Sequence, residues 1–234
     1  MLFDNEFDID LDKFKSIIKD KKIIIVDGII GAGKTTTIKT ITQYYNKDKL
    51  IVHPIYEPVD EWRETGALNE FYQDIKSKCL EFQTFTFITR IKRVIKEVLD
   101  NPNYEYYILE RSIWTDRYMF VELLKETLGP VRMKMYRHWW DMWYLIFPIK
   151  PTRWVLLDTS LEESIKRICK RDRCEEKHTI SIDYQNSLLE KHHIFYQKLQ
   201  DENQDVVIIS KDTMDTNFLN NQEIIEKLGG MIIK

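Results

Sequence analysis

The stretch DGIIGAGKTTT, residues 27–37, directly follows the apolar run KIIIV at residues 22–26. A short β-branched run that ends in glycine predicts a buried strand over residues 22–27, and a helix is expected over residues 33–46. The two are joined by Gly28-x4-Gly33-Lys34-Thr35, which is the pattern of a phosphate-binding loop. Glycines let backbone N–H groups turn toward an anion, and the positive end of the next helix faces the same point. This stretch therefore predicts nucleoside triphosphate binding.

The predicted loop covers residues 28–36. Lys34 is expected to reach the outer phosphates from a solvent-facing position, and Thr35 to offer its hydroxyl to Mg²⁺. The alternative is a glycine-rich turn that binds no ligand. The loop residues expected to contact ATP are Gly28, Gly31, Ala32, Gly33, Lys34, Thr35 and Thr36.

The composition sets limits on the rest of the chain. A length of 234 residues suits one domain, and 43% hydrophobic residues suffice for a core. A net charge of −3 argues against a general nucleic-acid binder, and no apolar run is long enough for a membrane span. Three cysteines without metal-ligand spacing are typical of reduced thiols, and the acidic N-terminus lacks the features of a targeting signal. We expect a cytoplasmic protein without nucleic-acid or membrane partners.

Strands alternate with helices along the chain, which predicts an α/β fold with a parallel sheet and a ligand site at the carboxyl ends of the strands. Strands are expected at 22–27, 50–57, 106–110, 153–158 and 205–210, with a break of the second at Pro54 or Pro58. Helices are expected at 33–46, 64–77, 79–100, 114–126, 131–146, 161–171, 181–200 and 217–228.

Charged residues follow two of these strands. Glu57 lies where the second strand meets Pro58, and a carboxylate there can take the proton of a substrate hydroxyl. Glu110 and Arg111 end the third strand, where they are placed to hold Mg²⁺ and to steady transferring oxygens. The alternatives are a turn glutamate and a structural salt bridge.

Two further segments carry candidate ligand contacts. Gln83, Thr86 and Arg90 share one face of the long helix, where a base edge or solvent would satisfy them. Arg167, Arg171 and Arg173 follow the fourth strand. They form either a cationic lid over a triphosphate or an ordinary solvated surface.

Five motifs in this order resemble those of the deoxyribonucleoside kinases, and the likeness covers residues 22–218. They are GIIGAGKTT at 28–36, EPVDEW at 57–62, FQTFTFITR at 82–90, ERSIWTDRYMF at 110–120 and KRDRCEE at 170–176. The resemblance implies a phosphate-loop kinase of three layers with a five-stranded parallel sheet, a lid over about 167–178, and a homodimer. It also implies transfer of the γ-phosphoryl group of ATP, with Mg²⁺, to the 5′-hydroxyl of a deoxyribonucleoside in the salvage of DNA precursors.

The resemblance assigns roles residue by residue. Glu57 would act as general base, Arg111 would hold the 5′-hydroxyl, and Gln83 would read the base edge. The remaining matches are Ile30, Trp62, Phe82, Thr86 and Phe120 around the nucleoside, Tyr72 and Glu176 at the 3′-hydroxyl, Lys34, Thr35 and Glu110 at phosphate and Mg²⁺, Arg167, Arg171 and Arg173 in the lid, and Phe218 near the adenine.

The chain departs from the family pattern at three places. Asp27-Gly28-Ile29 replaces the more common Glu-Gly-Asn, Thr86 replaces a smaller alanine, and Asp172 replaces a lid glycine. We expect the first to matter little, the second to affect pocket size, and the third either to slow closure of the lid or to blunt its charge.

Arg90 and Asp116 bear on base choice. In the resembled family, the thymidine-accepting branch has uncharged residues at these positions, and a thymine methyl packs poorly against a desolvated ion pair. We therefore expect deoxyadenosine, deoxyguanosine or deoxycytidine to be preferred over thymidine. Two other functions stay open, a nucleoside monophosphate kinase of the thymidylate kinase type and a non-catalytic structural relative.

Overall fold

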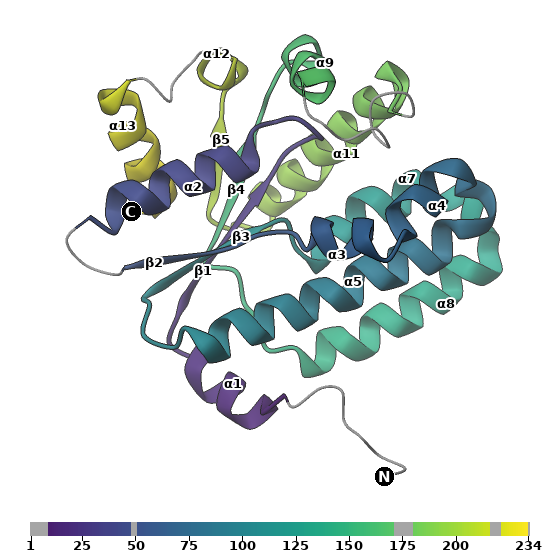
Figure 1. The fold of residues 1–234 in the computed structure, drawn as a ribbon, viewed down its shortest axis with the longest axis horizontal. Helices are drawn as coiled ribbons and strands as arrows, with labels where there is room; N and C mark the ends of the chain where they lie inside the picture. The colour runs from purple at the N-terminus through teal and green to yellow at the C-terminus, as the bar shows by residue number, and fades with distance from the viewer. Residues whose placement is uncertain (1–8, 48–50, 171–179, 216–220, 234) are drawn as a thin grey trace.

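The computed structural model describes residues 9–47, 51–170, 180–215 and 221–233. They contain one five-stranded sheet in the order β2-β3-β1-β4-β5, and all four neighbouring pairs are parallel (Figure 1). The strands are β1 (Lys22–Asp27), β2 (Val52–Ile55), β3 (Tyr106–Glu110), β4 (Arg153–Leu157) and β5 (Val206–Ile209). The predicted α/β fold with a five-stranded parallel sheet is confirmed.

The central strand β1 brings the candidate site together. Its residues from Ile23 to Asp27 are all buried, as expected for a strand covered on both faces. Val26 lies opposite Glu110 of β3, and Asp27 lies opposite Leu156 of β4. The loop after β1 and the acidic end of β3 therefore leave the sheet at the same edge.

Helices cover both faces of the sheet (Figure 1). α2 (Lys34–Tyr45) and α13 (Gln222–Ile233) pack on each other on one face, and α5 (Ile75–Asp100) and α8 (Lys125–Ile146) lie on the other. The remaining helices are α1 (Leu11–Ile18), α3 (Val59–Glu64), α4 (Ala67–Gln73), α6 (Ile113–Thr115), the π-helix η1 (Asp116–Phe120), α7 (Val121–Leu123), α9 (Leu161–Lys170), α11 (Ile182–Asp201) and α12 (Lys211–Met214). Within the described ranges, no helix is both long and apolar enough to cross a membrane.

Some predicted boundaries are wrong for identifiable local reasons. The expected helix over 64–77 is interrupted, because Gly66 with φ +77° begins α4 and Asp74 caps the separate helix α5. Pro54 lies inside β2 and does not end it, because β2 is an edge strand and needs no ladder bond on its outer side. The gap expected before residue 131 is a kink at Gly129 within α8.

Two short helices and one boundary were missed. The N-terminal α1 is capped by Asp10 and buries Phe14 and Ile18, although its acidic sequence did not indicate a helix. α12 lies between β5 and the last helix, and α13 begins at Gln222, five residues later than expected, and extends to Ile233. Each depends on packing against the rest of the fold, which local propensity does not report.

Candidate active site

The loop between β1 and α2 has the backbone that its sequence predicts. Gly31 and Gly33 have φ values of +82° and +93°, in the left-handed region that favours glycine. A Cβ on Gly31 would lie 2.6 Å from the carbonyl oxygen of Ser164, so the loop also packs too closely on α9 for a side chain. The loop therefore closes tightly at the amino end of α2, where backbone N–H groups favour an anion.

Lys34 departs from one expectation. Its side chain is buried, and Nζ donates to the carbonyl oxygens of Gly28 and Ile29, each over 3.1 Å. The prediction of a solvent-facing ammonium is wrong, because the loop folds back over the side chain. The ammonium nevertheless lies within the loop. Lys34 and Thr35 line the cavity of about 330 Å³ beside it, and Thr36 does not.

Thr35 and Glu110 form the candidate Mg²⁺ site. The Thr35 hydroxyl donates to Oε1 of Glu110 over 2.8 Å. Burial and the nearby Glu57 carboxylate raise the pKa of Glu110, a change that Lys34 opposes. Both side chains offer the hard oxygen ligands that suit Mg²⁺, which commonly completes its shell with phosphate and water. Among the described residues, no three His, Cys, Asp or Glu side chains group as a metal site, so Mg²⁺ binding here stays a prediction.

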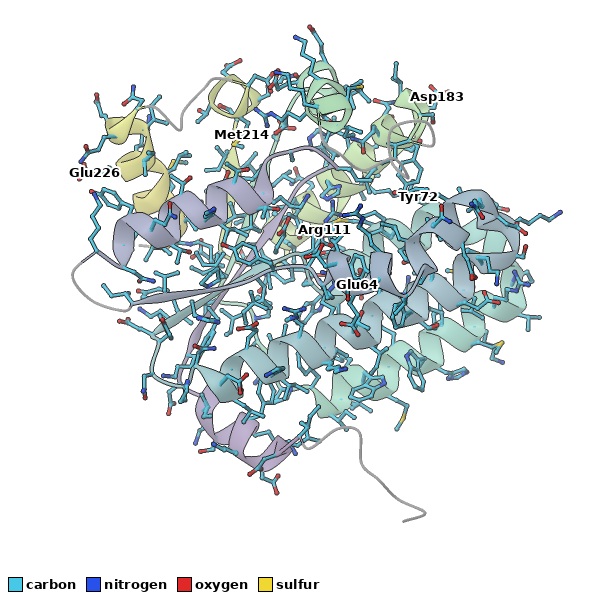
Figure 2. The ribbon with its side chains drawn as sticks, in the orientation of Figure 1. Glu64, Tyr72, Arg111, Asp183, Met214 and Glu226 are labelled. Carbon is cyan, nitrogen blue, oxygen red and sulfur yellow. The ribbon has the colours of Figure 1, made fainter. Side chains whose placement is uncertain are left out.

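A cavity of about 330 Å³ opens beside the loop. It is lined by every described residue predicted to contact the nucleoside: Ile30, Glu57, Trp62, Tyr72, Phe82, Gln83, Thr86, Arg90, Arg111, Asp116 and Phe120. Figure 2 labels Arg111 near the middle of the molecule and Tyr72 on α4, and both residues line this cavity. The structure therefore brings together side chains from segments as far apart as residues 30 and 120.

Six cavity residues were missed: Tyr56, Val59, Asp60, Leu68, Phe71 and Tyr184. Tyr56, Val59 and Asp60 flank Glu57 in sequence, and Phe71 precedes Tyr72. Their positions next to predicted site residues could have indicated that they line the cavity. Tyr184 near the start of α11 had no such signal, and burial raises its pKa to about 12. It arrives at the cavity only because α11 packs beside η1.

The long helix α5 presents its polar face to this cavity, as predicted. Gln83, Thr86 and Arg90 are all buried and all line it. Among the described residues, none hydrogen-bonds to the side-chain amide of Gln83, whose donor and acceptor are both available to a ligand. The apolar wall includes Phe82, which stacks on Phe71 with ring centroids 4.5 Å apart.

Glu57 lies between two arginines. Its Oε1 accepts from Arg90 Nη2 over 3.0 Å, and its Oε2 lies 3.4 Å from Arg111 Nε. Burial alone would raise the pKa of Glu57, but Arg111, Arg90 and Lys34 more than reverse this and lower the pKa to about 2. Glu57 is therefore a carboxylate throughout the neutral range, held at the junction of the loop and the cavity.

Arg111 has a strained backbone. Its φ of +63° is unusual for a residue with a side chain, and such strain is often found at functional sites. Its N–H bonds to the carbonyl of Val26, and its guanidinium lies 4.7 Å from the centroid of Phe120. Nε and Nη1 are buried without a hydrogen-bond partner among the described residues. The strain therefore places in the cavity a cation that pairs with Glu57 by charge and has two N–H donors without a hydrogen bond in the described part of the chain.

Arg90 and Asp116 form a two-pronged ion pair. Arg90 Nε and Nη2 donate to the two oxygens of Asp116 over 3.0 and 3.1 Å. Burial raises the pKa of Asp116, and the charge and hydrogen bonds of Arg90 oppose that change. Asp116 also begins the π-helix η1, an irregularity that is frequent at functional sites.

Of the predicted lid arginines, only Arg167 is described. Its Nη1 donates to the carbonyl oxygen of Ala32 over 3.1 Å, and its Nε pairs with Glu163 over 2.9 Å. The other predicted residues of this region, Arg171, Asp172, Arg173 and Glu176, lie outside the described residues, as does Phe218.

Known proteins share this sequence pattern. A family model described as deoxynucleoside kinase matches residues 24–233. The chain is 32% identical over 180 residues to a probable deoxycytidine kinase of Fowlpox virus, an alignment that covers 76% of this chain and 72% of that protein. It is 26% identical over 211 residues to deoxycytidine kinase 2 of Gallus gallus, covering 81% and 78%. It is 29% identical over 182 residues to mitochondrial thymidine kinase 2 of Homo sapiens, covering 75% of this chain and 64% of that protein.

Proposed function

The chain belongs to the deoxynucleoside kinase family, and on that premise we propose how it phosphorylates a deoxyribonucleoside with ATP. The family membership identifies it as an ATP-dependent deoxynucleoside kinase. We place the triphosphate on the loop at residues 28–36 and the nucleoside in the adjoining cavity. The γ-phosphoryl group then passes to the 5′-hydroxyl, the acceptor that Glu57 would meet.

One observation carries this proposal: the Glu57 carboxylate lies between Arg90 and Arg111 where the loop meets the cavity. An ionised carboxylate there accepts a hydrogen bond from the 5′-hydroxyl and orients its oxygen toward the phosphorus. A pKa of about 2 makes Glu57 a weak base, so orientation is the larger part of its role. This suits phosphoryl transfer, which depends mainly on positioning and electrostatics.

Charge stabilisation is assigned to the groups on the triphosphate side. Lys34 and the loop N–H groups bind the phosphates, and Arg111, two of whose donors have no hydrogen bond to any described residue, steadies the transferring oxygens. Thr35 and Glu110 would hold Mg²⁺, which neutralises phosphate charge when bound. Arg167 adds positive charge beside the loop, and the roles of Arg171 and Arg173 in the lid stay predictions.

Recognition of the nucleoside is assigned to the far end of the cavity. Gln83 offers the base edge its amide, which has no partner in the described part of the chain, between the rings of Trp62, Phe82 and Phe120. Stacking on these rings suits any flat base, so it contributes affinity more than choice. Tyr72 and Glu176 are the proposed contacts for the 3′-hydroxyl.

Base preference is assigned to Arg90 and Asp116. Four hydrogen bonds, to Asp116, Glu57 and the carbonyl of Glu110, occupy all but one of the five N–H donors of Arg90. The remaining donor suits an acceptor atom of guanine, and Asp116 suits the exocyclic amino group of cytosine or adenine. We propose that these three deoxynucleosides are preferred over thymidine.

The chain is also proposed to form a homodimer through α8. The face of this helix opposite its buried residues carries Val131, Met135, Trp139, Met142 and Leu145, with exposed fractions from 43% to 77%. Their spacing of three and four residues places them on one stripe. An apolar stripe of this length is typical of a surface that another chain covers.

A substrate panel tests the function. Purified enzyme with ATP and Mg²⁺ should phosphorylate at least one of the four deoxynucleosides and should act poorly on the four monophosphates. A phosphate on the acceptor would face the Glu57 carboxylate, which is why the monophosphates should fail. Preference for a monophosphate would favour the thymidylate kinase type of reaction instead.

A further inference from the structure

The back of the phosphate loop is held by two side chains that have no assigned role. Ser164 on α9 and Gln185 on α11 are both completely buried. The Ser164 hydroxyl and Nε2 of Gln185 each donate to the carbonyl oxygen of Ile30 over 2.7 Å. Nε2 of Gln185 also donates to Oγ of Ser164 over 2.6 Å. One loop carbonyl thus accepts two hydrogen bonds from a linked pair of buried donors.

The orientation of the Gln185 amide follows from this contact. Its nitrogen must face the loop, because an amide oxygen there would face the carbonyl oxygen of Ile30, and neither could donate. The amide oxygen, Oε1, is buried without a hydrogen-bond partner among the described residues. An unpaired buried acceptor is destabilising, so packing alone would favour an apolar side chain here.

The contact controls the peptide between Ile30 and Gly31. In a planar trans peptide the C=O and N–H groups point in opposite directions. Turning the Ile30 carbonyl toward α9 and α11 therefore directs the Gly31 N–H away from both helices. The next N–H, that of Ala32, is already bonded to the carbonyl of Ile29 over 3.1 Å. The orientation of this one peptide thus decides whether the Gly31 N–H can serve an anion.

The backbone alone does not determine that orientation. Gly31 has φ +82°, and glycine tolerates both signs of φ, so rotation of this peptide plane meets little steric resistance. Ile30 also lines the acceptor cavity, so the peptide lies where the proposed triphosphate and nucleoside sites meet.

We propose that Ser164 and Gln185 are positioning residues for phosphoryl transfer, because they hold the Ile30–Gly31 peptide with the Gly31 N–H directed at the triphosphate. The proposal rests on the ATP-binding role given to the loop above. Removing both donors frees the peptide to rotate, and any rotated population has one backbone donor fewer for the phosphates. The variants should therefore bind and use ATP less well, whereas their affinity for the nucleoside should not change.

The test compares Ser164→Ala, Gln185→Leu and the double variant with the wild type. Calorimetry measures binding of ATP with Mg²⁺ and, separately, of deoxycytidine, and steady-state assays give kcat and KM for ATP. The double variant should lose about tenfold or more in kcat/KM for ATP, in line with the loss of a preorganised donor. Its affinity for deoxycytidine should match that of the wild type.

Tyr107→Phe is the matched control. Tyr107 lies on β3 and does not line the cavity, and its hydroxyl donates to the carbonyl oxygen of Asn101 over 2.6 Å. It should lower the melting temperature without changing the constants for ATP. A folded double variant that uses ATP as well as the wild type would overturn the proposal, and so would an equal loss in Tyr107→Phe.

Two further outcomes distinguish the positioning role from a failure to fold and from a failure of the proposed function. If the double variant does not fold, Ser164→Ala carries the test, because it removes a single hydroxyl and should show a smaller loss of the same kind. If the wild type itself does not bind ATP, the proposed function fails, and not only the positioning role.

Discussion

At the scale of single residues, the surroundings of Glu57 determine what it can do. A carboxylate that two arginines hold ionised is a good acceptor for a hydroxyl proton but a weak base. The pKa of Asp27, the last residue of β1, changes in the opposite direction. Burial raises its pKa, while the Thr115 and Tyr196 hydroxyls donate to its oxygens over 2.7 and 3.1 Å. The first carboxylate faces the cavity, and the second ties β1 to the start of the helices that follow β3.

Glu57→Gln should lower kcat with a much smaller change in nucleoside affinity. The amide keeps the shape but loses the charge that orients the hydroxyl, and a positioned acid or base typically contributes about 10²–10⁴-fold. Steady-state kinetics on the preferred deoxynucleoside measures this. Glu64→Gln, on the exposed end of α3, is the control and should behave as the wild type. Collapsed affinity with surviving turnover would make Glu57 a binding residue only.

The lowered pKa of Glu57 also predicts a pH dependence of stability. A carboxylate whose pKa falls from 4.5 to about 2 on folding stabilises the native state above pH 4.5, and this contribution fades as the pH falls toward 2. The wild type should therefore exceed Glu57→Gln in free energy of unfolding at pH 7. The difference should shrink between pH 4.5 and 3, as measured by urea unfolding. A difference that grows on acidification would contradict the ionised assignment.

At the scale of elements, α5 and η1 together form the base-reading wall. α5 supplies Gln83 and Arg90 from one face, and the π-helix η1 places Asp116 against Arg90. Neither element presents the complete ion pair alone. The strained turn at Arg111 joins β3 to this wall and directs its guanidinium into the same cavity.

Arg90→Met combined with Asp116→Ala should raise thymidine phosphorylation relative to the other deoxynucleosides. The double change removes both charges of the pair at once, leaves Arg111 as the partner of Glu57, and provides an apolar recess for the thymine methyl. Because Glu57 loses one partner, total activity should fall, and only the ratios among substrates report the base choice. The ratios of kcat/KM over the four deoxynucleosides measure the shift. Arg93→Met, on the same helix outside the cavity, should leave the ratios unchanged. A wild type that already prefers thymidine would refute the base assignment.

At the scale of the whole molecule, the cavity and the apolar stripe belong to two helices that pack on each other. Residues of α5 line the cavity, and α8 carries the stripe. The buried face of α8 contributes Met133, Tyr136 and Trp140 to the core, whereas its opposite face remains exposed in the single chain. α8 packs on α5, which lines the cavity, so a dimer through the stripe would support the base-reading wall from behind.

Light scattering on the purified protein should give twice the chain mass of 28.3 kDa. Trp139→Glu with Leu145→Glu should give the single-chain mass, because like charges on the stripe cannot pair with each other when two copies meet and cannot be buried unpaired. Lys227→Glu on the exposed side of α13 is the control and should remain a dimer. A wild-type protein with the mass of one chain would show that the stripe serves another purpose.

The sequence by itself determined the features that depend on local pattern. Short apolar runs located all five strands, the first by a β-branched run that ends in glycine, and the loop motif placed Lys34 and Thr35 at the start of α2. The face shared by Gln83, Thr86 and Arg90 followed from helical periodicity. The strand-end position of Glu57, Glu110 and Arg111 followed from the parallel sheet, whose carboxyl ends meet at one edge.

Only the tertiary structure decided how these groups act on one another. The burial of Lys34, the lowered pKa of Glu57 and the two donors of Arg111 without a hydrogen bond to any described residue depend on neighbours brought in from other elements. Ser164 and Gln185 reach Ile30 across 134 and 155 residues of chain, a separation at which no spacing rule applies. Hydrogen bonding and desolvation are set by distance in space, and that distance exists only once helices and strands have packed.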